Sequence, residues 1–83
     1  MQEFLEFVLP HLVDYPGEMV LTTSEANKKT IFKLRVRQSD IGKVVGKQGQ
    51  TILAIRNILN AAAARFGEKA AFEIVEERGA ERT

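Results

Sequence analysis

Apolar residues near the start of the chain recur at three- and four-residue steps, at Phe4, Leu5, Val8, Leu12 and Val13. This period predicts an amphipathic helix that ends before the segment Tyr15-Pro16-Gly17. The pattern then changes to alternation, which predicts strands over residues 18–24 and 30–37. A polar turn, Ser24-Glu25-Ala26-Asn27, is expected to join them.

The predicted second strand alternates between apolar and basic side chains. The apolar set, expected to be buried, is Phe32, Leu34 and Val36. The basic set on the opposite face is Lys33, Arg35 and Arg37. These three bases either contact an anionic partner or keep an exposed sheet face solvated, and the pattern alone leaves both open.

The second half of the chain begins with a helical pattern that glycines interrupt. Ser39 is expected to cap a short helix over residues 40–45. A longer helix should run from Gln50 to Phe66, with Gly67 at its end. The inner face of this longer helix is predicted to carry Ile52, Ile55, Leu59, Ala62 and Phe66.

A last strand is expected over residues 70–77, with Phe72 and Ile74 facing the helices. Residues 78–83 should form a loose polar tail. The order helix, strand, strand, helix, helix, strand predicts an α+β fold with helices packed on one face of a three-stranded sheet. With 83 residues the chain should form a single domain over residues 1–77, because a core this small hides only roughly 60% of the unfolded surface.

Charge is distributed unevenly, although the net charge is only +1. Residues 1–27 carry five acids and no Lys or Arg, and residues 57–83 carry four bases and five acids. Between them, residues 28–56 carry eight bases against Asp40 alone. This basic middle third indicates an anionic partner.

Several classes of protein do not fit the composition. The absence of cysteine excludes disulfides and thiolate zinc sites. The first residues lack the basic start of a signal peptide, and no apolar run approaches the roughly 20 residues of a membrane-spanning helix. We therefore expect a cytoplasmic protein without metal or cofactor.

The most informative segment is a GxxG loop, Gly46-Lys47-Gln48-Gly49, between the two predicted helices of the second half. Glycines lack a Cβ atom, so the backbone can take positive φ and a sugar-phosphate chain can approach it closely. Lys47 in the loop and Lys43 one turn before it can offset phosphate charge, while N–H groups at the start of the next helix point toward the same anion. The placement of the loop is typical of a KH RNA-binding domain.

The run IGKVVGKQGQTILAIR within Asp40 to Ala64, followed by alanines, resembles the small bacterial single-KH RNA-binding proteins of the KhpA type, and Leu12-Val13-Asp14-Tyr15-Pro16 also fits that family. The resemblance implies a type II KH fold, no catalysis and cytoplasmic binding of single-stranded RNA. It also implies a homodimer or a heterodimer with a larger KH-domain protein. The expected role is RNA chaperoning or regulation of transcripts for cell division and cell shape.

The candidate site has three parts. Gly46 and Gly49 give access to the backbone, Lys47 and Lys43 neutralise phosphates, and Gln48 is expected to hydrogen-bond the sugar-phosphate chain. The flanking residues that should line the base-facing side are Ile41, Val44, Val45 and Ile52, and Gly42 is a further candidate RNA-binding residue. Auxiliary RNA contacts are expected from Arg35, Arg37 and Arg56. A groove for about four nucleotides should bind weakly, so dimerisation or a partner would raise the affinity.

Other interpretations of these residues are weaker. A Walker phosphate loop needs four residues between its glycines, and Gly42 and Gly46 enclose three. His11 has no partner at catalytic or metal-binding spacing, and Glu73, Glu76 and Glu77 are expected to face solvent. The run Ala61-Ala62-Ala63-Ala64 favours helix and would also let another helix approach in a dimer. An assembly adaptor that binds protein, or a ribosome-maturation factor, remains an alternative.

Overall fold

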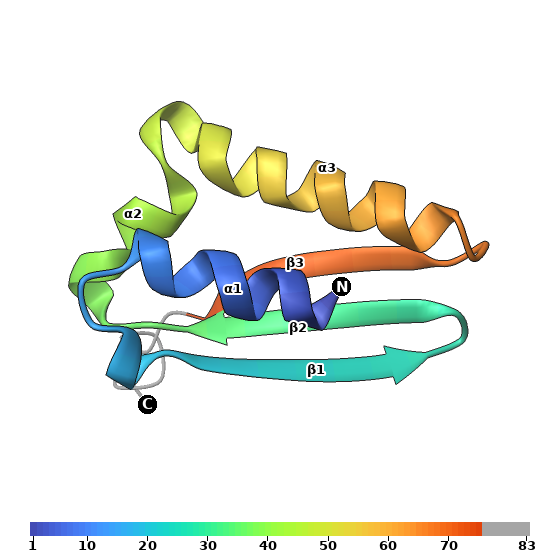
Figure 1. Cartoon of the computed structure of the whole chain (residues 1–83), viewed down its shortest axis with the longest axis horizontal. Coiled ribbons are helices and arrows are strands. Elements are labelled where there is room, and N and C mark those ends of the chain that lie inside the picture. The colour runs from blue at the N-terminus through green and yellow to red at the C-terminus, as the bar shows by residue number, and fades with distance from the viewer. Residues whose placement is uncertain (76–83) are drawn as a thin grey trace.

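The computed structural model describes residues 1–75. The elements are helix α1 (Gln2–Leu12), strands β1 (Val20–Ala26) and β2 (Lys29–Arg35), helices α2 (Ile41–Val45) and α3 (Gln50–Ala64), and strand β3 (Lys69–Val75). Short 3-10 turns occupy Pro16–Glu18, Gln38–Asp40 and Lys47–Gly49. The predicted order of helices and strands is confirmed (Figure 1).

The three strands form one mixed sheet in the order β1-β2-β3. Strands β1 and β2 are antiparallel, as a hairpin requires, and β2 and β3 are parallel because α2 and α3 carry the chain back to the same end of the sheet. Phe32 in the central strand lies opposite Thr23 of β1 and Phe72 of β3. Helices α1 and α3 cover one face of this sheet, which confirms the predicted α+β architecture (Figure 1).

The core lies between the sheet and the helices. Phe32, Leu34 and Phe72 point from the strands into it and are at most 1% exposed. The helices supply the remaining buried apolar side chains, which include Leu5, Leu9, Val44, Ile55, Leu59 and Ala63. Ile74 packs partly buried against this cluster. The alternation in the sequence therefore predicted the inner faces of β2 and β3 correctly.

The hairpin turn lies later in the chain than the sequence suggested. Strand pairing continues to Ala26 and Lys29, so Ser24 and Glu25 belong to β1 and the turn consists of Asn27 and Lys28. Both turn residues have positive φ, of 51° and 63°, as in the two-residue turns that match the twist of a hairpin. The prediction relied on polar composition, which does not report backbone handedness. Strand β2 also ends at Arg35, so Arg37 lies outside it.

Helix α3 ends two residues before the predicted Phe66. Gly67, with φ of 68°, donates its N–H to the carbonyl of Ala64 at 3.0 Å, which closes the helix with a left-handed residue. Phe66 lies past the helix end and is 77% exposed, and Ala63 is buried in place of Ala62. The predicted inner face was therefore wrong at Ala62 and Phe66, because the stripe follows Ile55, Leu59 and Ala63.

Two smaller expectations also need comment. Ser39 does not cap α2, because it lies inside the turn Gln38–Asp40 and no side-chain cap is present. The end of the predicted last strand, residues 76–77, and the predicted tail, residues 78–83, lie outside the described residues. Within residues 1–75, none of the helices has the length and apolar character needed to cross a membrane.

The burial of α3 predicts the outcome of two matched substitutions. Ile55 is 4% exposed and Ile58 is 49% exposed. Ile55→Val should lower the free energy of unfolding by about 0.5–1.5 kcal/mol, because it leaves a methyl-sized cavity in the core. Ile58→Val should change it by less than about 0.5 kcal/mol. Urea denaturation measures both, and equal losses would contradict the assigned face of the helix.

Candidate nucleic-acid interface

The segment from α2 to α3 stands out from one end of the molecule (Figure 1). Helix α2 has only five residues and ends where the N–H of Gly46 donates to the carbonyl of Gly42 at 2.8 Å. A second hydrogen bond, from the N–H of Gly49 to the carbonyl of Gly46 at 3.1 Å, closes the loop into a tight turn. The loop therefore has a defined backbone before any ligand is present.

Three of the four loop residues have left-handed backbone angles. Gly46 has φ of 81° and ψ of 172°, Gln48 has φ of 57° and ψ of 26°, and Gly49 has φ of 75° and ψ of 12°. The angles of Gly46 fall in a region that is essentially confined to glycine. Gln48 takes a left-handed conformation although it carries a side chain, which costs free energy that the surrounding structure must offset.

The two glycines have different surroundings. A Cβ atom on Gly46 would collide with the side chain of Thr51 and lie 2.8 Å from its backbone nitrogen. A Cβ atom on Gly49 would meet nothing within 4 Å. Gly46 is thus required by the fold itself, whereas the space beside Gly49 is open. The open side is where another chain can approach the backbone.

Helix α3 begins directly at this loop. Gly49 occupies its N-cap position and supplies no side-chain cap, so the first N–H groups of the helix are not covered by a capping side chain. Such groups favour an anion, both by donating hydrogen bonds and through the helix dipole. Because α3 has 15 residues, its dipole is well developed.

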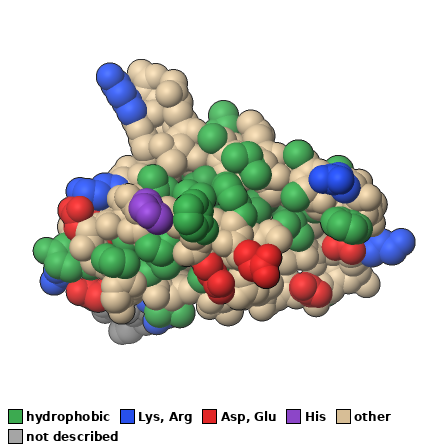
Figure 2. All heavy atoms as spheres, in the orientation of Figure 1, with side chains coloured by type: hydrophobic (Ala, Val, Ile, Leu, Met, Phe, Trp, Pro, Cys, Tyr) green, Lys and Arg blue, Asp and Glu red, His purple; other side chains and the backbone are tan. Residues whose placement is uncertain are grey.

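The two predicted phosphate-binding lysines differ in their environment. Lys47 is exposed in the loop, and a basic side chain projects from this end of the molecule (Figure 2). Lys43 instead forms an ion pair with Asp14, with 3.2 Å between Nζ and Oδ2. Both side chains of the pair are about half exposed, so the interaction is weak and Lys43 can exchange partners.

Asp40, which the sequence analysis noted only as the lone acid of the basic third, has a structural role beside the loop. It is fully buried, and its two carboxylate oxygens accept the backbone N–H groups of Asp14 at 3.2 Å and Tyr15 at 3.0 Å. These bonds hold the segment after α1 against the start of α2. They also place Asp14 within reach of Lys43. No local pattern in the sequence signals this role, because the bonded residues are about 25 positions apart.

The apolar residues around the loop divide into two groups. Ile41, Val45 and Ile52 are partly buried and leave part of their side chains on the surface. The prediction that Val44 lines the base-facing side is wrong, because Val44 is fully buried and supports α2 from within the core. Gly42 lies in α2 with open space around it. The structure therefore brings the predicted residues together around one loop, with Val44 beneath it.

The predicted auxiliary arginines lie in three different places. Arg35 lies with Lys33 on the face of the sheet opposite the helices. Arg37 stacks over the ring of Tyr15 at 4.1 Å and pairs with Glu18 at 3.7 Å. Arg56 of α3 donates from Nε to the carbonyl of Phe72 at 3.1 Å. The expected ladder of three bases on one strand face is thus limited to Lys33 and Arg35.

Comparison with known proteins gives one family model and several similar proteins. A family model described as the KhpA/KhpB KH domain matches residues 2–74. The chain is 44% identical over 78 residues to the RNA-binding protein KhpA of Chlamydia trachomatis, covering 94% of this chain and 100% of the relative. It is 42% identical over 74 residues to the protein of that name in Borreliella burgdorferi, covering 89% of this chain and 90% of the relative. It is 36% identical over 76 residues to the protein of that name in Listeria monocytogenes, covering 92% of this chain and 100% of the relative. No solved structure matches significantly.

The contrast between the glycines predicts three different effects of adding one methyl group. Gly46→Ala should lower the free energy of unfolding by more than the roughly 1–2 kcal/mol expected for a left-handed alanine, because the methyl group also meets Thr51. Gly49→Ala should cost only that amount. Gly42→Ala, the helical control, should leave stability unchanged or raise it by about 0.4–1 kcal/mol. Urea denaturation gives the ranking, and a smaller cost at position 46 than at position 49 would refute it.

Proposed function

Because the chain belongs to the KhpA/KhpB family of KH domains, we propose that it is a non-enzymatic protein that binds single-stranded RNA at the loop Gly46–Gly49. The observation that carries this proposal is the backbone of that loop, which has no side chain at Gly46 and Gly49 and is left-handed at these two residues and at Gln48. Such a loop lets a sugar-phosphate chain lie against the main chain, and about four nucleotides fill a groove of this kind. Relatives named as RNA-binding proteins support the choice of ligand.

The cations around the loop have unequal roles in this proposal. Lys47 is exposed and positioned to meet a phosphate directly, together with the uncapped N–H groups of α3. Lys43 reaches a phosphate only by leaving Asp14. Asp14 therefore competes with RNA for the same ammonium group. The partly exposed side chains of Ile41, Val45 and Ile52 provide an apolar surface for bases once the backbone is held.

A single short groove gives low affinity, so we include a dimer in the proposal. Helix α3 presents Leu53, which is 55% exposed, and Ile58, and exposed Phe66 follows its end. Apolar side chains gather on the surface over α1 and α3 (Figure 2). Small residues such as Ala54 and Ala61 leave room for a second helix. Two joined grooves raise the effective concentration of RNA at each of them.

The role in the cell follows from this dimeric, weakly selective binding. A homodimer, or a heterodimer with a larger KH-domain protein, acts as a cytoplasmic RNA chaperone or as a regulator of transcripts, with cell division and cell shape among the processes affected. The exposed apolar residues of α3 also favour the alternative of an assembly adaptor. A ribosome-maturation factor would prefer folded ribosomal RNA to loose single strands. A comparison of binding to folded RNA and to loose single strands separates the ribosome-maturation factor from the RNA chaperone.

Reversing the charge of the loop should strongly weaken RNA binding. In Lys47→Asp/Gln48→Asp, two carboxylates face the phosphates, and the affinity for a short single strand should fall sharply in a fluorescence-anisotropy titration. The matched control is Lys28→Asp/Asn27→Asp, which makes the same chemical change at the hairpin turn on the other end of the sheet. The milder Lys47→Gln should reduce the log-log salt slope by about 0.7, the value of one phosphate contact to a single strand. Retention of binding by the loop variant would reject the proposal and favour the adaptor.

Releasing Lys43 from its carboxylate should strengthen RNA binding. Asp14→Asn removes a partly exposed ion pair worth about 0.2–1 kcal/mol, so the affinity for a single strand should rise by up to about fivefold. Glu25→Gln is the control, because it removes an equal charge from β1 and breaks no ion pair among the described residues. Titration by anisotropy at low salt measures both. An equal gain in the two variants would assign the effect to general charge and not to Lys43.

A further inference from the structure

The face of the sheet that points away from the helices has no cover among residues 1–75. Alternation and register place three side chains in each row across this surface, which we call the open face. Its rows are Val20-Arg35-Val75, Thr22-Lys33-Glu73, Ser24-Ile31-Ala71 and Ala26-Lys29-Lys69. The residues between them, such as Phe32 and Phe72, point into the core. The loop Gly46–Gly49 belongs to the other side of the sheet, beside the helices (Figure 1).

The open face is strongly basic. It carries Lys29, Lys33, Arg35 and Lys69 against the single carboxylate of Glu73. Within residues 1–75 the ion pairs closer than 4 Å join Arg37 to Glu18 and Lys43 to Asp14, and neither involves this face. Glu73, the register partner of Lys33, offsets one of the four positive charges, so the described part of the open face keeps an excess of three.

One pair on this face works against the stability of the sheet. Lys29 of β2 and Lys69 of β3 are direct partners in the register, and both are exposed. Like charges at directly opposed positions destabilise a sheet. A polyanion that reaches both ammonium groups would relieve this repulsion.

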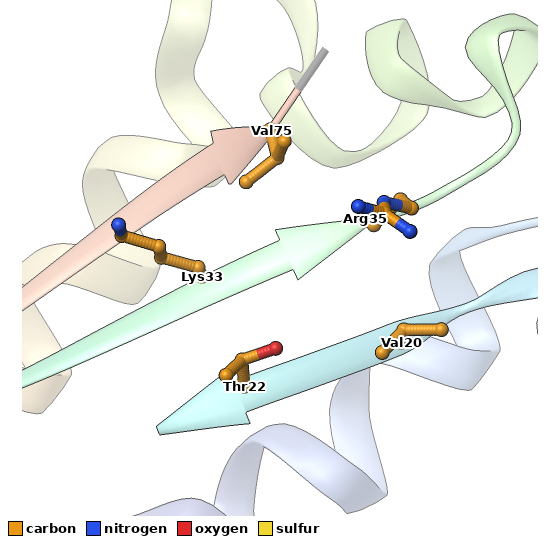
Figure 3. A pocket seen from close by; sticks show the side chains of 5 residues that line it. All are labelled: Val20, Thr22, Lys33, Arg35 and Val75. Atoms are coloured by element: carbon orange, nitrogen blue, oxygen red, sulfur yellow. The ribbon is translucent and has the colours of Figure 1, made fainter. Parts of the chain in front are cut away.

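The shape of the open face favours a phosphate backbone. A shallow hollow of about 330 Å³ is lined by Val20, Thr22, Lys33, Arg35 and Val75. Lys33 of β2 lies opposite the hydroxyl-bearing Thr22 of β1, and Arg35 lies farther along β2, opposite Val20 (Figure 3). The two cations are two residues apart on one strand, roughly 6.6 Å along it. A guanidinium and an ammonium in this arrangement can each hold one phosphate of a chain.

The side chains of this face argue against other kinds of partner. None of its described residues is aromatic, so bases have nothing to stack on. Its larger apolar side chains are Val20, Ile31 and Val75, and a cation of β2 lies beside each of them in the register. They therefore form no continuous apolar patch of the kind that a stable protein interface or a membrane-binding surface needs. Cations beside hydroxyls and isolated aliphatic side chains suit a sugar-phosphate backbone bound without regard to sequence.

We propose that the open face binds a second stretch of RNA backbone, so that one chain holds two strands, one at the loop and one across Lys29, Lys33, Arg35 and Lys69. This inference rests on the proposed function, because it assigns the loop to the first strand. The two surfaces lie on opposite sides of the sheet, so about four nucleotides at the loop do not extend to the open face. The protein then brings separate RNA segments together, which is the physical step that strand annealing requires.

The test measures capture of two strands that cannot pair with each other. A short single strand labelled with a donor dye fills the loop, a longer single strand carries the acceptor, and energy transfer reports that one protein holds both. Lys33→Gln/Arg35→Gln should leave binding of the short strand unchanged and should reduce energy transfer. The log-log salt slope for binding of the longer strand should fall by about 1.4, because two phosphate contacts are lost. The matched control for the single substitution Arg35→Gln is Arg65→Gln, which removes the same charge from the end of α3. Arg65→Gln should leave energy transfer unchanged. In a dimer, the loop of the second chain also captures RNA and adds the same background of energy transfer in every variant. The diagnostic quantity is therefore the decrease in energy transfer in the open-face variants.

A second variant separates ligand binding from folding. Lys29→Gln/Lys69→Gln removes the opposed like charges, so it should raise the midpoint of urea unfolding while it reduces energy transfer. Full energy transfer in both open-face variants would overturn the inference. If these variants also bound polyglutamate less tightly than the unchanged protein, the open face would be assigned to an acidic protein partner. Failure of the proposed function has a different signature, namely unchanged capture of the short strand by Lys47→Asp/Gln48→Asp.

Discussion

The structure depends most on the close approach of Gly46 to Thr51. No side chain fits between these two residues, so the chain can leave α2 and enter α3 only with a bare, left-handed backbone at this point. The hydrogen bonds from Gly46 and Gly49 fix the resulting turn. A loop that is rigid before a ligand arrives loses little conformational entropy on binding. The same constraint that shapes the fold therefore prepares the binding surface.

Charge is arranged around this loop by a second, buried interaction. The carboxylate of Asp40 holds the backbone of Asp14 and Tyr15, and Asp14 in turn reaches Lys43. The acidic first third of the chain is thus brought against the basic middle third at one defined place. Lys47 and the open face remain outside this contact. Folding converts an uneven sequence into two separate basic surfaces, one beside the helices and one behind the sheet.

The sequence predicted the elements that depend on local pattern, and it did so because apolar period and glycine spacing are local signals. The order of helices and strands, the inner faces of β2 and β3, and the position of the glycine loop all follow from such patterns. The hairpin turn at Asn27 and Lys28, the exposure of Phe66 and the end of α3 depend on backbone handedness and helix phase over several turns, which composition does not report. The burial of Asp40 and its contact with Asp14 and Tyr15 join segments about 25 residues apart, and no local pattern contains that information. The position of Arg37 outside the basic face of β2 was not predicted for the same reason, because its partners Tyr15 and Glu18 are distant in sequence.

The central claim is that RNA rests on the main chain of the loop. Its most direct test is a titration of the isotopically labelled protein with a short single-stranded RNA, followed by the amide resonances. The largest and earliest shifts should occur at Gly46, Lys47, Gly49 and the first residues of α3, because these amides lie in or directly beside the stretch of main chain on which the phosphates rest. Shifts confined to the exposed side of α3 or to the strands, with the loop amides unmoved at saturation, would contradict it.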